Sequence, residues 1–375
     1  MGFNVFSSLG ALGGSYTSWI VPFLFTLTVI VFFHELGHFL VARLHGIRVL
    51  VFSIGFGPEL VGFTDRHRTR WKISAVPLGG YVKFFGDENE ASMPNAATLA
   101  AMTEEERRQS FPGQSVGARA AVVAAGPITN FLLAIVIFAG VFMFYGKTTA
   151  IPRIAAVEPG SAAAAAGFQV DDLIVSIDGG KIDNFADVQR IVNFNPGRML
   201  TMEVERGGSL VTLHATPAEK DKKGILGITR SNAPGDVKTE SVGVTEAVWL
   251  GVDKTWFVIE TTMLYLRDVV IGRQSADQIG GPIKIAQISG EVAKLGLGAL
   301  LDFTGLLSVS IGLLNLFPVP LLDGGHLLFY GIEAARGRPL SERAQEVGFR
   351  IGLAIVVMLM IFAAFNDLRP YLAGS

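Results

Sequence analysis

Four stretches of the chain are apolar over the roughly 20 residues that a membrane-spanning helix needs. They are residues 18–42, 120–145, 299–322 and 347–365. Gly126 and Pro127 lie near the start of the second stretch, and membrane helices tolerate both where neighbouring helices satisfy the freed backbone groups. Arg350 in the fourth stretch can extend to an interface. The pattern predicts a membrane protein that is mainly α-helical and has four transmembrane helices.

Two shorter runs between the first and second stretches have the pattern of strands. The runs "VLVFSIGFGPEL" and "WKISAVPLGGYVKFF" are rich in β-branched and aromatic residues, and glycines interrupt them. The pattern predicts strands with turns or bulges at these glycines, which are Gly55, Gly57, Gly79 and Gly80. The polar stretch that follows is typical of a loop, although Thr103 and Glu106 have the spacing of a helix capping box.

A small module is predicted between the second and third stretches. Residues 151–218 alternate short apolar runs with turn signals, and "PGSAAAAAG" followed by "DDLIVSIDG" resembles a PDZ domain, an α+β fold that binds peptides by strand addition. Asp171 stands where that family usually has glycine, and a PDZ-like spacer that only restricts access is the alternative. Residues 244–295 mix apolar and charged positions, which favours an amphipathic helix on the membrane surface.

Composition and charge narrow the class of protein. Of the 375 residues, 50% are hydrophobic and only 17% are charged, which is not the balance of a soluble enzyme. The net charge of −2 lacks the basic footprint of a nucleic-acid-binding protein, so we expect no nucleic-acid partner. The chain has no cysteine, so any metal must be held by histidine, aspartate or glutamate.

Positive charges set the expected orientation in the membrane. Lysine and arginine gather between the first and second spanning stretches and again between the third and fourth, so both segments are expected in the cytoplasm. The two termini and the region from 146 to 298 are then expected on the outer side. In order, the expected parts are the first helix (1–47), a cytoplasmic β-region with a loop (48–118), the second helix (119–146), the PDZ-like module (150–220), an amphipathic helical region (221–298), the third helix (299–326), a cytoplasmic loop (327–346), the fourth helix (347–366) and a tail (367–375).

The first spanning stretch contains "HELGH", with three ionisable side chains in five residues. Such groups are expensive within a membrane unless they are paired or used, so a polar cluster that only joins helices explains the motif poorly. On a helix, His34 and His38 lie on nearly the same face and can hold one metal ion. Glu35 is turned away from this pair and can act on a water molecule at the metal without being a ligand.

Two histidines leave a catalytic zinc short of a protein ligand. Asp323 in "NLFPVPLLDGGH" is the natural candidate, because it ends the third spanning stretch in the same cytoplasmic half of the bilayer as the histidine pair. Gly324 and Gly325 after it would let the backbone turn toward the metal. His326 is a rival ligand, whereas Asp302 lies at the other end of the stretch and too far away in depth.

Asn315 is a candidate for contact with a substrate. Pro318 and Pro320 follow it and interrupt the hydrogen-bond ladder of the helix, which leaves carbonyl groups unpaired. An amide at this place could hold a substrate backbone or stabilise an oxyanion. The alternative is a hydrogen bond between two helices.

Five motifs in this order resemble the site-2 protease family of intramembrane zinc metalloproteases, and within it the bacterial branch of the regulator of sigma-E protease. The motifs are "HELGH", "GFGP", "PLGGYVKFFGD", "AAGPITNFLLA" and "NLFPVPLLDGGH". The resemblance covers nearly the whole chain. It implies that His34, His38 and Asp323 bind one Zn²⁺. It also implies that Glu35 is the catalytic acid and base and that Asn315 contacts substrate.

The resemblance further implies a substrate and a location. The β-region would be membrane-associated and would present an edge to an unwound substrate, with Gly55, Gly57, Gly79 and Gly80 at substrate-binding positions. The substrate would be a single-pass membrane protein of the anti-sigma factor type or a signal-peptide remnant, cleaved in the cytoplasmic half of a bacterial inner membrane. The PDZ-like module would lie in the periplasm and bind a peptide or partner, although the best-known relatives have two such modules.

Two other classes of function stay open on the sequence alone. A membrane-anchored PDZ scaffold with a structural metal site predicts that Glu35→Gln leaves function intact, because that change removes only the base. A transporter that uses Glu35 and Asp323 as an ion relay predicts ion-dependent flux and no new peptide ends.

Overall fold

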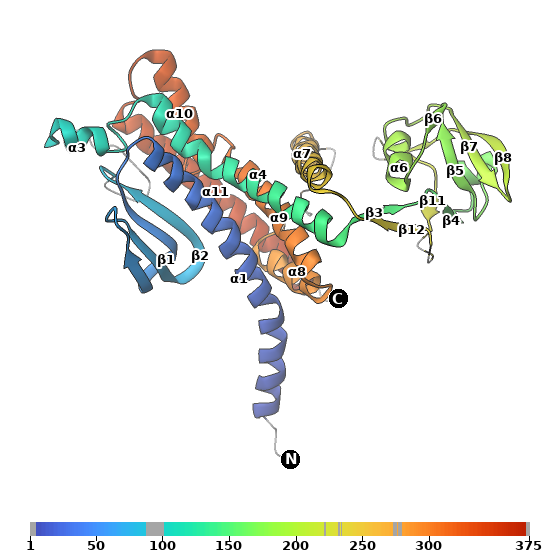
Figure 1. Ribbon diagram of the computed structural model, residues 1–375, viewed down its shortest axis with the longest axis horizontal. Coiled ribbons are helices and arrows are strands. Elements are labelled where there is room, and N and C mark those ends of the chain that lie inside the picture. Colours follow the sequence, from blue (N-terminus) through green and yellow to red (C-terminus); the bar gives the residue numbers. More distant parts are fainter. Residues whose placement is uncertain are drawn as a thin grey trace. The chain divides into compact units, whose positions relative to one another are not determined.

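The computed structural model describes residues 5–87, 101–220, 223–231, 233, 235–272, 276 and 280–372. The chain divides into two compact units. The helical unit comprises Met1–Val141 and Thr245–Ser375, and the inserted unit comprises Phe142–Val244 (Figure 1). Most of the predicted polar loop, residues 88–100, lies outside the described part of the chain.

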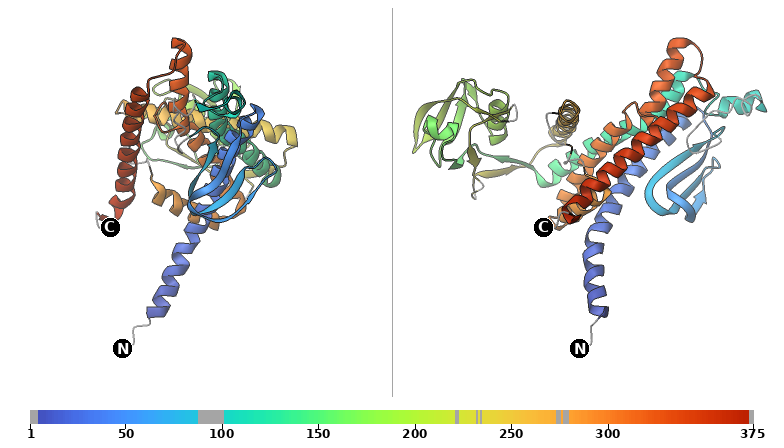
Figure 2. Two further views of the ribbon diagram at one scale, coloured as in Figure 1. Left: turned by 90° about the vertical axis from the view of Figure 1, so that its left-hand side faces the viewer. Right: turned by 180° about the vertical axis from the view of Figure 1, so that it is seen from behind.

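Among the described residues, four helices of the helical unit are long and apolar enough to cross a membrane. They are Ser18–Leu44 within α1 (Val5–Leu44), α4 (Val116–Tyr145), α9 (Leu297–Asn315) and Arg343–Arg369 within α11 (Glu342–Leu372). Three of them pack closely, since Gly37 of α1 meets Ala125 of α4 and Gly305 of α9 meets Phe138 of α4 (Figure 2). The four helices match the four predicted stretches and confirm a membrane protein.

The third of these helices ends earlier than predicted. α9 stops at Asn315, whereas the apolar stretch runs to residue 322. Pro318 and Pro320 cannot donate the backbone hydrogen bonds that would continue the helix. A separate helix, α10 (Asp323–Arg336), follows, so Asp323 opens a new helix instead of ending the third one.

A sheet of two long, bent strands packs beside α1. β1 (Val49–Thr64) and β2 (Arg70–Phe84) pair twice, because residues 51–54 of β1 lie between residues 70–73 and residues 80–83 of β2. Phe52 is buried where this sheet meets α1 and stacks on Trp71. The pairing leaves the last residues of β2 at one edge of the sheet.

The predicted glycine interruptions fall where the strands bend. Gly55, Gly57 and Gly79 have φ of 88°, 85° and 139°, conformations that a residue with a side chain rarely adopts. Gly80 is required for another reason, because an added Cβ would lie 2.8 Å from a side-chain carbon of Val31 in α1. The edge of β2 therefore lies against α1.

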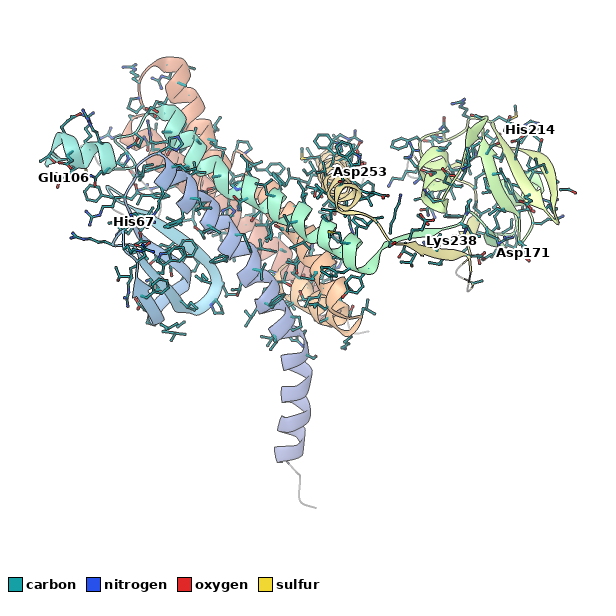
Figure 3. The ribbon with its side chains drawn as sticks, viewed as in Figure 1. His67, Glu106, Asp171, His214, Lys238 and Asp253 are labelled. Carbon is teal, nitrogen blue, oxygen red and sulfur yellow. The ribbon has the colours of Figure 1, made fainter. Side chains whose placement is uncertain are left out.

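Asp65 ties the turn between β1 and β2 to the end of α1. Its carboxylate accepts hydrogen bonds from the backbone N–H groups of His67 and Thr69 and from the side chains of Arg43 and Trp71. His67 marks this turn in Figure 3. Burial raises the pKa of Asp65, but these hydrogen bonds outweigh burial and lower that pKa to about 2. The turn is thus held by a carboxylate that is charged at neutral pH.

The inserted unit contains a four-stranded antiparallel sheet in the order β6-β5-β7-β8. The strands are β5 (Leu173–Ile177), β6 (Gly180–Lys181), β7 (Leu200–Arg206) and β8 (Ser209–Ala215), and the two helices are α5 (Ala162–Ala166) and α6 (Phe185–Asn193). Ile154, Ile174, Leu200, Met202 and Val204 are fully buried at its centre. The unit therefore has a hydrophobic core of its own.

Three further strand pairs extend this unit beyond the predicted end of the module at residue 220. They are β3 (Lys147–Ala150) with β12 (Val237–Glu240), β4 (Ile154–Val157) with β11 (Ile228–Arg230), and β9 (Ala218–Lys220) with β10 (Lys223–Ile225). The pairing of β11 with β4 brings the chain after residue 220 back to the start of the unit.

The remaining helices are α3 (Glu104–Gln109), α7 (Val244–Val270) and α8 (Pro282–Lys294). Thr103 and Glu106 form the predicted capping box at the start of α3. α7 packs on α4 through a face of small residues, since a Cβ on Gly251 would lie 2.7 Å from the carbonyl oxygen of Ile135. Its other side exposes large apolar residues, among them Trp249, Trp256 and Phe257. That α7 lies on the membrane surface as an amphipathic helix stays a prediction.

Candidate active site

The predicted metal ligands come together from two helices far apart in the sequence. His34 and His38 lie one turn apart on α1, and Asp323 is the first residue of α10. The Nε2 atom of His34 lies 3.2 Å from the Nε2 atom of His38 and 3.2 Å from Oδ2 of Asp323. Oδ1 of Asp323 lies 3.7 Å from Nε2 of His38. Three donor atoms, one from each residue, therefore converge within 4.8 Å of one another.

A backbone carbonyl orients the ring of His38. Its Nδ1 atom lies 2.8 Å from the carbonyl oxygen of Val122 in α4, and a carbonyl can only accept a hydrogen bond. Nδ1 therefore carries the proton, and the lone pair of Nε2 faces the cluster. On His34 the corresponding Nδ1 atom lies 3.2 Å from the side-chain amide of Asn130.

Glycines allow α4 to approach the two histidines. A Cβ on Gly126 would lie 2.3 Å from Nε2 of His38 and 2.8 Å from Cε1 of His34. One turn beyond His34 on α1, a Cβ on Gly37 would lie 2.5 Å from the carbonyl oxygen of Ala125. All three distances are too short for a side chain, so the close contact of α1 with α4 at the site depends on glycine in both helices.

The start of α10 also depends on glycine, but for a reason that the sequence did not predict. Neither Gly324 nor Gly325 has a positive φ, so they are not needed for a turn. A Cβ on Gly324 would lie 2.3 Å from two carbonyl oxygens of the preceding turn, and one on Gly325 would lie 2.4 Å from a third. Close backbone packing thus fixes the position of Asp323, at a helix N-terminus that favours a carboxylate.

Glu35 lies between the metal-binding residues and the edge of the sheet. A Cβ on Gly80 would lie 3.0 Å from Cγ of Glu35. A cavity of about 450 Å³ is lined by Glu35, the three metal-binding residues and residues 80–82 of β2. The cavity therefore connects the edge of β2 with the predicted catalytic carboxylate.

The other candidates lie at varying distances from this cluster. Asn315, the last residue of α9, is half-buried and its side chain makes no hydrogen bond to a described residue, so the predicted alternative of a bond between helices is not observed there. His326 lines the cavity, but it is not part of the metal-binding cluster and packs on Phe349. Asp302 pairs with Lys254 and takes no part in the cluster.

The four glycines predicted to contact substrate separate into two groups. Gly80 lines the cavity beside Glu35. Gly55, Gly57 and Gly79 do not line it and lie at the bends of the strands. Their substrate role stays a prediction, and only Gly80 has the position that it requires.

Sequence reasoning missed the contribution of α4 to the site. Asn130 is fully buried in this helix and lies beside His34, and Gly126 lies beside both histidines. The available signal was a polar residue inside the apolar run "AAGPITNFLLA". A buried amide in a membrane helix needs a partner, and here it lies beside a predicted metal ligand.

The chemistry of the cluster fits a zinc ion. Although Nε2 of His34 lies 3.2 Å away, no hydrogen bond from a described residue satisfies the buried Oδ2 atom of Asp323. A buried carboxylate oxygen without a hydrogen bond and two imidazole nitrogens directed at one point form a donor set that zinc accepts. Three protein ligands leave a fourth position of a tetrahedral ion free, which is the arrangement of a catalytic site.

Comparison with known proteins leads to the same chemistry. The model of peptidase family M50 matches residues 22–359. The chain is 52% identical over 359 residues to "Putative zinc metalloprotease R01501" of Rhizobium meliloti, covering 93% of this chain and 96% of the relative. It is 50% identical over 371 residues to "Putative zinc metalloprotease Atu1380" of Agrobacterium fabrum, with coverages of 96% and 98%. It is 38% identical over 383 residues to "Metalloprotease MmpA" of Caulobacter vibrioides, with coverages of 94% and 96%.

Proposed function

Because the chain belongs to peptidase family M50, the site-2 protease family, and is a zinc metalloprotease, we propose that it cleaves peptide bonds within or beside the membrane-spanning segments of single-pass membrane proteins. One observation carries this proposal. His34 and His38 of the metal-binding cluster lie within Ser18–Leu44, a helix apolar enough to cross a membrane. Ionisable side chains at such a depth mark a functional site.

In this proposal His34, His38 and Asp323 hold the zinc ion, and Glu35 moves the proton. Zinc supplies a Lewis acid that polarises the scissile carbonyl and lowers the pKa of a water molecule toward about 7. Glu35 takes the proton from the attacking water and returns it to the leaving amine, so one carboxylate serves as base and then as acid. The amide of Asn315 contacts the substrate backbone.

The edge of β2 is proposed to hold the substrate in an extended form. A spanning helix hides its peptide bonds in its own hydrogen-bond ladder, so the helix must unwind before hydrolysis. Pairing with a strand edge replaces the lost hydrogen bonds. Two observations support this role: within the described part of the chain, residues 80–83 pair with β1 on one side only, and residues 80–82 line the cavity that contains Glu35.

We propose that the inserted unit is a PDZ domain that binds a peptide of a substrate or partner. A groove of about 560 Å³ lies between α6 and β11. Phe185, Val188 and Val192 of α6 give it an apolar wall, and Ile228 of β11 lies opposite. β11 pairs with β4 on one side, so an extended peptide can add to its other side. Loss of peptide binding on substitution of Ile225, an exposed residue of this groove, by aspartate tests this role.

The proposed location is the inner membrane of a bacterium. The arginines and lysines that follow α1, and Arg336, Arg338 and Arg343 where α10 connects to α11, favour the cytoplasm for these segments. The inserted unit and both termini then lie in the periplasm, and the metal-binding cluster lies in the cytoplasmic half of the bilayer. An anti-sigma factor or a signal-peptide remnant suits such a site, because each offers a single spanning helix.

Purified protein in detergent tests the proposed reaction. It is incubated with a panel of single-pass helices, and new peptide ends are mapped by mass spectrometry. Wild type should produce new ends, whereas Glu35→Gln and chelator-treated protein should not. Cleavage that survives both treatments would overturn the zinc mechanism. Full biological function of Glu35→Gln would favour a scaffold with a structural metal site, and ion flux without new peptide ends would favour a transporter.

A further inference from the structure

Asn130 is an unusual residue for its position. It lies within α4, one of the four helices apolar enough to cross a membrane, and none of its surface is exposed. Its side-chain Nδ2 atom lies 3.2 Å from Nδ1 of His34, and its Oδ1 atom has no hydrogen-bond partner among the described residues. A buried amide costs free energy unless it is hydrogen-bonded, so its contact with the ring of His34 requires an explanation.

We propose that Asn130 is a positioning residue for zinc: its amide oxygen accepts the Nδ1–H of His34 and holds that ring with the lone pair of Nε2 facing the metal. This inference rests on the proposed role of His34 as a ligand. It adds a residue from α4 to a site whose ligands come from α1 and α10.

The proton on His34 sets the direction of this hydrogen bond. A neutral imidazole carries one proton, and binding of zinc through Nε2 places that proton on Nδ1. Nδ1 then needs an acceptor, as Nδ1 of His38 has in the carbonyl oxygen of Val122. The oxygen and nitrogen of an amide have nearly the same shape, so half a turn about the last side-chain bond of Asn130 brings its oxygen to the ring.

Helix α9 holds Asn130 in place. The hydroxyl of Ser308 donates a hydrogen bond of 2.8 Å to the backbone carbonyl of Asn130. A Cβ on Gly312, one turn further along α9, would lie 3.0 Å from Cβ of Asn130. Because this hydrogen bond fixes the backbone of Asn130 and α9 packs against its Cβ, the side-chain amide stays beside His34. The two histidines thus have different supports, a backbone carbonyl for His38 and a replaceable side chain for His34.

Zinc affinity tests this inference without relying on activity. Asn130→Leu keeps a similar volume but removes the acceptor, whereas Asn130→Asp keeps an acceptor at the same place. Zinc affinity is measured on detergent-purified protein by competition with a chelator. Loss of an outer partner of a ligating histidine typically weakens binding about 10–100-fold, so we expect that loss for Asn130→Leu and less than about threefold for Asn130→Asp. Ser310→Ala is the matched control, because it removes a hydroxyl of α9 that donates to the carbonyl oxygen of Leu306 within the same helix and leaves the hydrogen bond of Ser308 to Asn130 in place, and it should bind zinc as wild type does.

The outcomes separate this inference from the proposed function. Wild-type affinity in Asn130→Leu, or equal losses in Asn130→Leu and Asn130→Asp, would overturn the role of Asn130 alone. If Asn130→Leu does not fold, Asn130→Asp decides, since a tenfold loss there contradicts the proposal. His34→Ala is measured beside them, and unchanged zinc affinity in that variant would instead refute the ligand set on which the proposed function depends.

Discussion

Gly126 is the place where the smallest substitution should disturb the active site most directly. A methyl group at this position would lie 2.3 Å from Nε2 of His38, whereas ordinary contacts are 3.4–4 Å, so His38 must move by about 1 Å. A displacement of about 1 Å of a residue in an active site lowers the rate about 100-fold, which corresponds to about 2.7 kcal/mol of transition-state stabilisation. We therefore expect Gly126→Ala to cleave a single-pass substrate about 100-fold more slowly than wild type.

Gly140 provides the matched control for this experiment, because it lies in the same helix and an added Cβ there meets nothing within 4 Å. Alanine is also a better helix former than glycine by about 1 kcal/mol in water, so Gly140→Ala should keep its thermal stability and its rate. Initial rates are compared at saturating zinc, and zinc affinity is measured in parallel. A Gly126→Ala rate within about twofold of Gly140→Ala would refute the steric reasoning, because it corresponds to less than about 0.5 kcal/mol.

Three further predictions concern the base, the sheet and α10. Glu35→Gln should bind zinc as wild type does but lose about 10²–10⁴-fold in rate, the usual contribution of a general base, and metal analysis with kinetics checks both. The pKa of Asp65 in the folded protein, about 2, lies below its unfolded value of about 3.9, so its stabilisation is present above pH 4 and is lost as the pH falls toward 2. The difference in unfolding temperature between wild type and Asp65→Asn should therefore shrink over that range, and a constant difference would contradict the assignment. Arg119→Met leaves the partly buried Glu333 without its ion-pair partner and should destabilise the protein by about 1–3 kcal/mol, between the values for exposed and buried pairs, whereas Arg119→Met with Glu333→Leu should recover much of that loss in the same unfolding assay.

The sequence was sufficient to predict which residues of α1 and α10 form the cluster. The cost of ionisable groups in an apolar stretch singled out His34 and His38, and matching depths in the membrane selected Asp323. Those arguments depend on position along a spanning stretch, which hydropathy reports directly. Hydropathy did not show where the third stretch breaks, because its apolar residues continue to residue 322, whereas Pro318 and Pro320 did indicate an interruption after Asn315.

The contribution of α4 was not predictable from the same signals. Hydropathy shows that Asn130 is polar within an apolar run, but it does not show which helix faces it. Gly126 shows a related limit, since a glycine in a membrane helix can mark a kink, a close contact or neither. Only the packing of α4 on α1 shows that both residues lie beside the histidines.

The site thus requires close backbone packing both where α4 meets the histidines and at the start of α10. The start of α10 tests this requirement more strictly. Near Gly126 the neighbouring atoms belong to imidazole rings, which can rotate, whereas a Cβ on Gly324 would lie 2.3 Å from two backbone carbonyl oxygens, which cannot. Gly324→Ala should therefore displace the start of α10, remove Asp323 from the cluster and weaken zinc binding more than Gly126→Ala does. Gly331→Ala, in the same helix with open space around it, should bind zinc as wild type does. Tighter zinc binding in Gly324→Ala than in Gly126→Ala would show that backbone packing does not position the third ligand.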